Sequence, residues 1–118
     1  MLPHKSGGVA DYSTDEVWTG GYWVDGKKIY RKVIYFSSLL TISNTSWTDT
    51  DITVSSLNIY NILFAEAITN KGPSSNYNGC YPIMAIAEGE KLKVLAARDS
   101  NPVYAYMICI QYTKTTDT

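Results

Sequence analysis

Hydrophobic residues in this chain recur mainly at every second position, and short turn-forming runs separate the alternating segments. In the clearest case, Lys91 and Lys93 alternate with Leu92 and Val94. A period of two places neighbouring side chains on opposite faces of a strand, so the pattern predicts β-strands. The turn signals are Gly20-Gly21, Asp25-Gly26, Ser43-Asn44, Lys71-Gly72-Pro73, Asn78-Gly79, Glu88-Gly89 and Ser100-Asn101-Pro102.

The strongest local signal is a hairpin over residues 22–30, YWVDGKKIY, with Asp25-Gly26 at its centre. Asp-Gly favours a two-residue type I′ turn, because both central residues of that turn need a positive φ. This register pairs Trp23 with Lys28 and puts Tyr30 on the same face.

Further segments have the character of strands. Residues 33–36, VIYF, are apolar on both faces, which predicts burial on both sides. Residues 58–69 alternate only in part and would also suit a helix, but their turn-rich flanks favour a strand. Residues 103–114 are mainly apolar on both faces and are expected at the centre of a sheet. The other expected strands are 52–57 and the pair 81–87 and 91–98, joined at Glu88-Gly89-Glu90.

Short strands at this spacing in a chain of 118 residues predict a single all-β domain, an antiparallel, jelly-roll-like β-sandwich over 11–118. Residues 1–10 have the composition of an extended lead-in or linker. Ten tyrosines and frequent Thr and Ser agree with strands. The sequence has no apolar stretch near the roughly 18 residues of a transmembrane helix, so we expect no membrane insertion.

Charge and candidate chemistry argue against several functions. The net charge of −1 gives no basic excess for nucleic acid. The basic cluster at 27–32 (Lys27, Lys28, Arg31 and Lys32) suits a solvated hairpin surface better than a phosphate site. The single histidine, His4, and the absence of CxxC make a metal site or a His-based triad improbable, and we expect no cofactor and no enzyme. The nearest carboxylate groupings, Asp15 with Glu16 and Asp49 with Asp51, fit turns.

The two cysteines, Cys80 and Cys109, lie in apolar runs and suit buried thiols, with a disulfide as the alternative. The aromatics offer more chemistry. Trp47 and Tyr77 lie in polar loops beside Asp49 and Asn76, a pattern that suits stacking on a sugar with hydrogen bonds to its hydroxyls. The alternative is that both rings fold back over the core edge. Trp18 and Trp23 are expected to be packing anchors.

Three stretches resemble a family. They are YSTDE at 12–16, YWVDGKKIYRK at 22–32 and IQYTKTTD at 110–117. They are similar to the YSTEE, TWIDGKPIY and YTKTTD segments in the C-terminal domain of bacteriophage tail-fibre and receptor-binding proteins. Lys28 stands where the family often has proline, which restores a backbone donor and leaves the hairpin intact. The segments bracket nearly the whole chain, while its middle has no signature.

The resemblance implies a virion protein, assembled in the host bacterial cytoplasm, that forms homotrimers and contacts other tail or baseplate proteins. Such proteins bind host surface polysaccharide, teichoic acid or protein. The matching motif residues look structural, so receptor contacts are expected in the middle loops, with Trp47, Tyr77, Asn76 and Asp49 as candidates. A fibre or baseplate cap, or a trimerisation domain, is the alternative, and a depolymerase is the third possibility.

Overall fold

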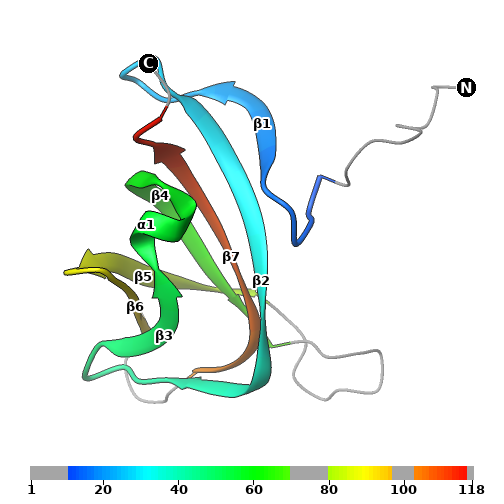
Figure 1. The fold of residues 1–118 in the computed structure, drawn as a ribbon. Helices are drawn as coiled ribbons and strands as arrows, with labels where there is room; N and C mark the ends of the chain where they lie inside the picture. Colours follow the sequence, from blue (N-terminus) through cyan, green and yellow to red (C-terminus); the bar gives the residue numbers. More distant parts are fainter. Residues whose placement is uncertain (1–10, 70–79, 97–102, 117–118) are drawn as a thin grey trace, which may run out of the picture.

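The structure is a computed structural model that describes residues 11–69, 80–96 and 103–116. The described residues form an antiparallel sheet with the order β1-β2-β7-β4-β5-β6-β3 (Figure 1). The prediction of a single, antiparallel all-β domain is confirmed. The elements are β1 (Val17–Tyr22), β2 (Lys28–Ile42), β3 (Thr48–Thr53), α1 (Val54–Leu57), β4 (Ile59–Ile68), β5 (Cys80–Glu88), β6 (Lys91–Ala96) and β7 (Val103–Lys114).

The two layers of this sandwich-like fold come from one continuous, strongly bent sheet. β5 belongs to both layers, because residues 80–82 pair with β4 and residues 83–88 pair with β6. The bend brings β6 and β3 over the β2–β7–β4 layer (Figure 1). The far end of β2 then meets β6, where the Ala96 amide donates to the Ser43 carbonyl at 2.8 Å. β1 remains at one edge, beyond the folded part of the sheet.

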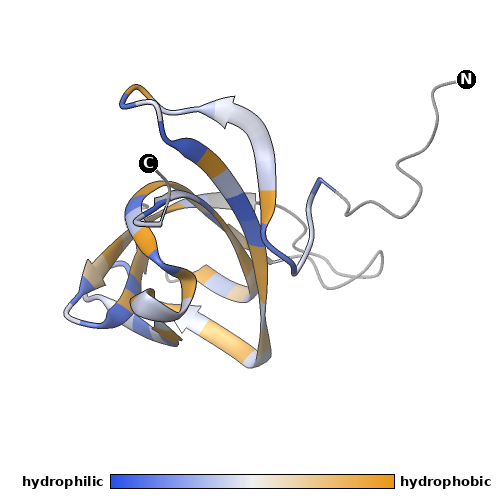
Figure 2. Cartoon of the chain, turned by 45° about the horizontal axis from the view of Figure 1, so that its top comes forward, coloured by the Kyte–Doolittle hydropathy of each residue, from blue (hydrophilic) through white to orange (hydrophobic). Residues whose placement is uncertain are grey.

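The core lies between the two layers, and Figure 2 shows the apolar segments along these strands. Leu92, Val94 and Ala96 are buried on alternate positions of β6, as their spacing predicts. The expected central position of 103–114 is also confirmed, since β7 lies between β2 and β4. The fully buried large side chains are Tyr112, Ile42, Leu92, Ile108, Ile110 and Val94.

The buried side chains of β7 do not follow one alternation along the whole strand. Ala105 is buried at the start of the strand, yet Ile108 and Ile110 are buried further on. The change lies near a shift in the β2–β7 register, where Tyr35 pairs with Met107 and the next recorded pair joins Leu40 to Ala105. The apolar character of both faces of β7 therefore serves one bent core.

Two strand predictions need correction. Residues 52–57 are not one strand, since β3 ends at Thr53 and residues 54–57 form a single helical turn closed by Asn58 at a left-handed φ of 54°. β4 follows at once, so the preference for a strand over a helix at 58–69 is correct. Residues 33–36 are not buried on both sides, because Ile34 and Phe36 pack against the core while Tyr35 on the other face is 62% exposed.

The predicted turn of the first hairpin is also wrong. Trp23 donates its amide to the Lys27 carbonyl at 2.8 Å, and Gly26 donates to the Trp23 carbonyl at 2.9 Å. The loop therefore has three residues, 24–26, with a positive φ of 88° at Gly26 and none at Asp25. This turn is favoured because its left-handed position falls on glycine, and Asp25 Oδ1 accepts from the Lys27 amide at 3.0 Å.

The longer loop moves the register by one residue. Tyr22, not Trp23, pairs with Lys28, and Trp18 pairs with Tyr30. Directly paired residues share a face of the sheet, so Tyr22 and Lys28 lie together and Trp23 lies on the opposite face. This change assembles the surface described next.

Candidate functional site

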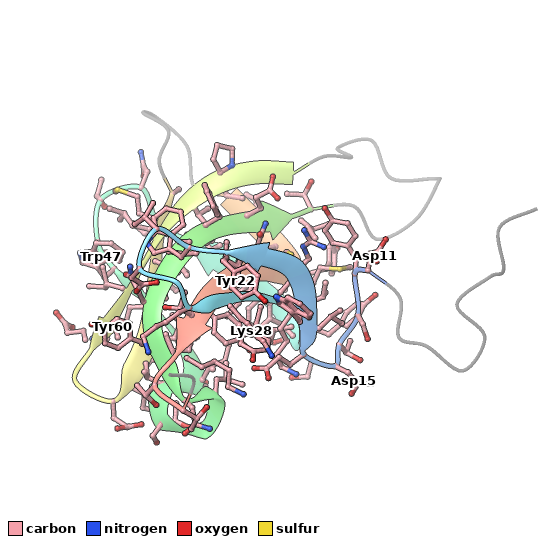
Figure 3. All side chains as sticks on the ribbon, turned by 90° about the horizontal axis from the view of Figure 1, so that it is seen from above. Asp11, Asp15, Tyr22, Lys28, Trp47 and Tyr60 are labelled. Carbon is pink, nitrogen blue, oxygen red and sulfur yellow. The ribbon has the colours of Figure 1, made fainter. Side chains whose placement is uncertain are left out.

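An exposed aromatic surface lies on the β1–β2 hairpin, and we call its three residues, Trp18, Tyr22 and Lys28, the platform. The Trp18 and Tyr22 rings meet edge to face with centroids 5.7 Å apart and are 43% and 59% exposed. Lys28 Nζ lies 4.9 Å from the centroid of the Trp18 ring. Figure 3 shows Tyr22 and Lys28 close together beside these two strands. The three side chains form one continuous surface of two rings and an ammonium group.

A bulge in β1 holds the platform in place. The register shifts between Trp18 and Tyr22, and Gly20 in the bulge has a φ of 89°. Trp18 Nε1 donates to the Gly21 carbonyl at 3.0 Å, which fixes the orientation of the indole. Thr19 Oγ1 donates to the Ile29 carbonyl at 3.0 Å and ties the bulge to β2. The Gly20-Gly21 pair therefore allows the backbone conformation of the bulge. A role in the backbone is also what its sequence context predicted.

A second cluster lies next to the platform, and we call it the junction: Glu16, Tyr30, Tyr112 and Lys114. Lys114 Nζ is 2.7 Å from Glu16 Oε2, with both side chains largely buried. The Tyr112 hydroxyl donates to Glu16 Oε1. The Tyr30 and Tyr112 rings are 6.3 Å apart, and Lys114 Nζ lies 5.0 Å from the Tyr30 centroid. The two oxygens of one carboxylate thus bind two side chains near the end of β7, Tyr112 and Lys114.

The junction changes the acidity of Tyr112. Burial raises the pKa of this hydroxyl well above the usual value for tyrosine, and the hydrogen bond to Glu16 raises it further. Ionisation would place a phenolate in the core edge beside a carboxylate. Tyr112 therefore stays a neutral donor across physiological pH, which suits a structural role.

The segment before β1 is bound along β2. The Ser13 carbonyl accepts from the Val33 amide at 2.8 Å, and the Thr14 carbonyl accepts from Lys32 Nζ. Arg31 Cζ lies 4.4 Å from the Tyr12 ring centroid. The three stretches that carry the family resemblance therefore meet in space, and most of their contacts are structural.

The basic side chains at 27–32 make more contacts with the rest of the domain than a solvated hairpin surface would. Lys27 Nζ lies 4.8 Å from the Tyr60 centroid and contacts the Lys114 carbonyl at 3.4 Å. Arg31 and Lys32 hold the segment before β1, as described above. Lys28 differs from these three, because its recorded side-chain contact is with the Trp18 ring of its own hairpin, whereas the other three also donate to carbonyls of other segments. The cluster does not converge on one phosphate-sized point.

The structure leaves the predicted loop site incomplete. Trp47 is 37% exposed at the start of β3, and Asp49 is exposed, with its Oδ1 accepting from the Asp51 amide at 2.8 Å. Tyr77 and Asn76 lie outside the described residues. Figure 3 places Trp47 well away from Tyr22, so the loop residues and the platform are separate surfaces.

The platform was not predicted from the sequence, because Trp18 was expected to be a packing anchor. Trp23 does fit that expectation, since it is partly buried and meets Phe64 edge to face at 6.4 Å. The signal that could have separated the two tryptophans is Gly20-Gly21. A bulge at that point bends β1, and the Trp18 side chain then lies outside the core.

A groove of about 540 Å³ lies on the outer face of β2, β7 and β4. Cys109 is a buried thiol at this groove, which confirms its prediction, while the side chain of Cys80 lies outside the described residues. Glu66 is the acidic residue among the described residues of the lining. Tyr12, Ser13, Thr14, Val33, Tyr35, Ile68 and Met107 complete the lining.

Within residues 11–69, 80–96 and 103–116, no three His, Cys, Asp or Glu side chains are grouped to hold a metal ion. In the same ranges, no helix is long and apolar enough to cross a membrane. Comparisons with protein-family models, curated proteins and solved structures found no match to this chain.

Proposed function

We propose that this domain is a non-catalytic receptor-binding module of a phage virion, which attaches to a glycan on the host surface. The observation that carries the proposal is the platform: two exposed rings held in fixed orientation with a lysine beside them. Exposed aromatic rings that are already ordered bind at a low entropic cost. The resemblance to tail-fibre proteins supplies the biological setting.

The platform chemistry suits a saccharide. The apolar C–H face of a pyranose can pack on an indole or phenol ring, while the Tyr22 hydroxyl and the Lys28 ammonium offer polar contacts to its hydroxyls. One such open site binds weakly. Several copies in a homotrimer, and several trimers on one particle, would raise avidity by roughly 10²–10⁴ without new contacts.

A structural fibre or baseplate role is the second candidate, and the outer groove favours it. Its lining is mostly apolar, and Tyr35 is 62% exposed beside it. Exposed apolar surface of this kind is commonly covered by another subunit. A cap or trimerisation domain would use this face and would not need the platform.

The test is binding of the purified domain to an array of bacterial surface glycans, with Trp18→Ala alongside. We expect binding by the wild type and a loss of at least tenfold in the variant. Tyr104→Ala is the matched control, because Tyr104 is 51% exposed but pairs with Thr41 at the other end of β7. Circular dichroism checks that each variant is folded.

Trp47→Ala tests the predicted loop site in the same assay. Loss of binding in this variant with none in Trp18→Ala would move the receptor site to the loops. No binding of the wild type to any glycan would contradict the proposal and favour the structural role.

A further inference from the structure

We infer that the platform selects a glycan bearing an anionic group, a carboxylate or a phosphate, over a neutral one. This inference rests on the proposed function, since it specifies the ligand of the same surface. It follows from the electrostatic difference between the two lysines that lie over aromatic rings on this face of the sheet.

Those two lysines have different partners. Lys114 lies over the Tyr30 ring and is neutralised by Glu16 at 2.7 Å. Lys28 lies over the Trp18 ring and is exposed, and among the described residues no carboxylate forms an ion pair with it. The positive charge of the platform is therefore not balanced within the described part of the domain.

Among the described residues, no neighbouring acid forms an ion pair with Lys28. Both oxygens of Glu16 are used inside the junction, by Lys114 and by the Tyr112 hydroxyl. Asp25 Oδ1 accepts from the Lys27 amide within the hairpin loop. An anionic ligand on the platform would therefore meet the Lys28 ammonium and no unpaired carboxylate of the junction.

The geometry places the charge beside the stacking surface. Lys28 Nζ is 4.9 Å from the Trp18 centroid, so a sugar lying on the exposed rings would bring an attached anion within reach of the ammonium. Charge-assisted hydrogen bonds are stronger than neutral ones, and loss of one in an open site corresponds to about a tenfold loss of affinity. Because the site is exposed, the selectivity should weaken as salt is raised.

The experiment compares three probes by calorimetry at low and high salt. The first is a short uronic-acid oligosaccharide, and the second is the same oligosaccharide with its carboxylates reduced to alcohols. The third is a short polyol-phosphate oligomer without sugar rings, which separates a phosphate source from a uronate source. We expect the uronate to bind about tenfold more tightly than its reduced form.

Variants assign the selectivity to Lys28. Lys28→Gln should remove the preference for the uronate, and Lys28→Arg should retain it, because arginine keeps the charge. Lys91→Gln is the matched control, since Lys91 begins β6 in the other layer. Trp18→Ala should weaken both the uronate and its reduced form.

Each outcome separates the inference from the proposed function. Equal binding of the uronate and its reduced form, lost in Trp18→Ala, overturns the inference and leaves the proposed function standing. Polyol-phosphate binding that matches the uronate and is unaffected by Trp18→Ala overturns it as well, since charge alone would suffice. No binding of any anionic probe overturns the inference, and a negative neutral glycan array then removes the proposed function too.

Discussion

The platform and the junction are adjacent clusters built from the same kinds of residue, but their roles are opposite. Each has two aromatic rings and a lysine over one of them. In the junction, Tyr112 has 0% exposure and Glu16 neutralises the lysine. In the platform, Tyr22 is 59% exposed and no described carboxylate pairs with the lysine. A buried, neutralised cluster stabilises the fold, and an exposed, charged one is available to a ligand.

The difference arises from position along the hairpin. Trp18 and Tyr30 are directly paired, so the two clusters share a face of the sheet. Tyr30 lies where β2 also pairs with β7, whereas Tyr22 and Lys28 lie nearer the tip, past the last recorded β2–β7 pair. Residue type alone therefore does not decide whether an aromatic in this hairpin is structural or functional.

The largest expected effect comes from removing one tyrosine of each cluster. Tyr112→Ala should lower the free energy of unfolding by about 3–5 kcal/mol, because it empties a buried ring site and removes the donor to Glu16 Oε1. Tyr22→Ala should change it by no more than about 0.5 kcal/mol, because the ring is exposed. Urea denaturation followed by circular dichroism measures both. Equal losses would show that the platform also supports the fold.

The second-largest effect is expected from removing the charge of Glu16, the carboxylate that the junction has and the platform lacks. Glu16→Gln should cost about 1–2 kcal/mol, because it removes the ion pair to Lys114 and weakens the acceptor for Tyr112. Lys28→Gln should cost no more than about 0.5 kcal/mol. A double-mutant cycle of Glu16→Gln with Lys114→Met isolates the pair. A coupling energy near zero would contradict the structural role of the junction.

The smallest effect is a pH dependence confined to alkaline solution. The folded state raises the pKa of Tyr112, so the unfolded chain loses this proton first as the pH rises above about 10. The stabilisation is therefore fully present below that pH and declines above it, by about 1 kcal/mol between pH 10 and 11. Denaturation at both pH values should show this loss in the wild type and not in Tyr112→Phe. Parallel curves for the two proteins would refute the assignment.

Local patterns predicted most strands correctly but not the geometry that forms the platform. The alternation at 91–94 specified which residues of β6 are buried, since only the apolar face of an alternating strand packs against the core. Asp25-Gly26 correctly marked the turn but not its length, because two-residue and three-residue loops both accept this dipeptide. The one-residue difference decided whether Trp23 or Tyr22 lies beside Lys28.

Residue periodicity and backbone preferences were enough to predict the fold class, the central position of β7 and the turns at Asp25-Gly26, Ser43-Asn44 and Glu88-Gly89. Tertiary structure alone decided that Glu16 meets Tyr112 and Lys114, residues almost a hundred positions away, and that Trp18 stays exposed while Tyr112 is buried. The physical reason is that burial and charge neutralisation depend on what lies opposite a residue. In this domain, strand order and register set that partner, and both depend on segments that lie far apart in the sequence.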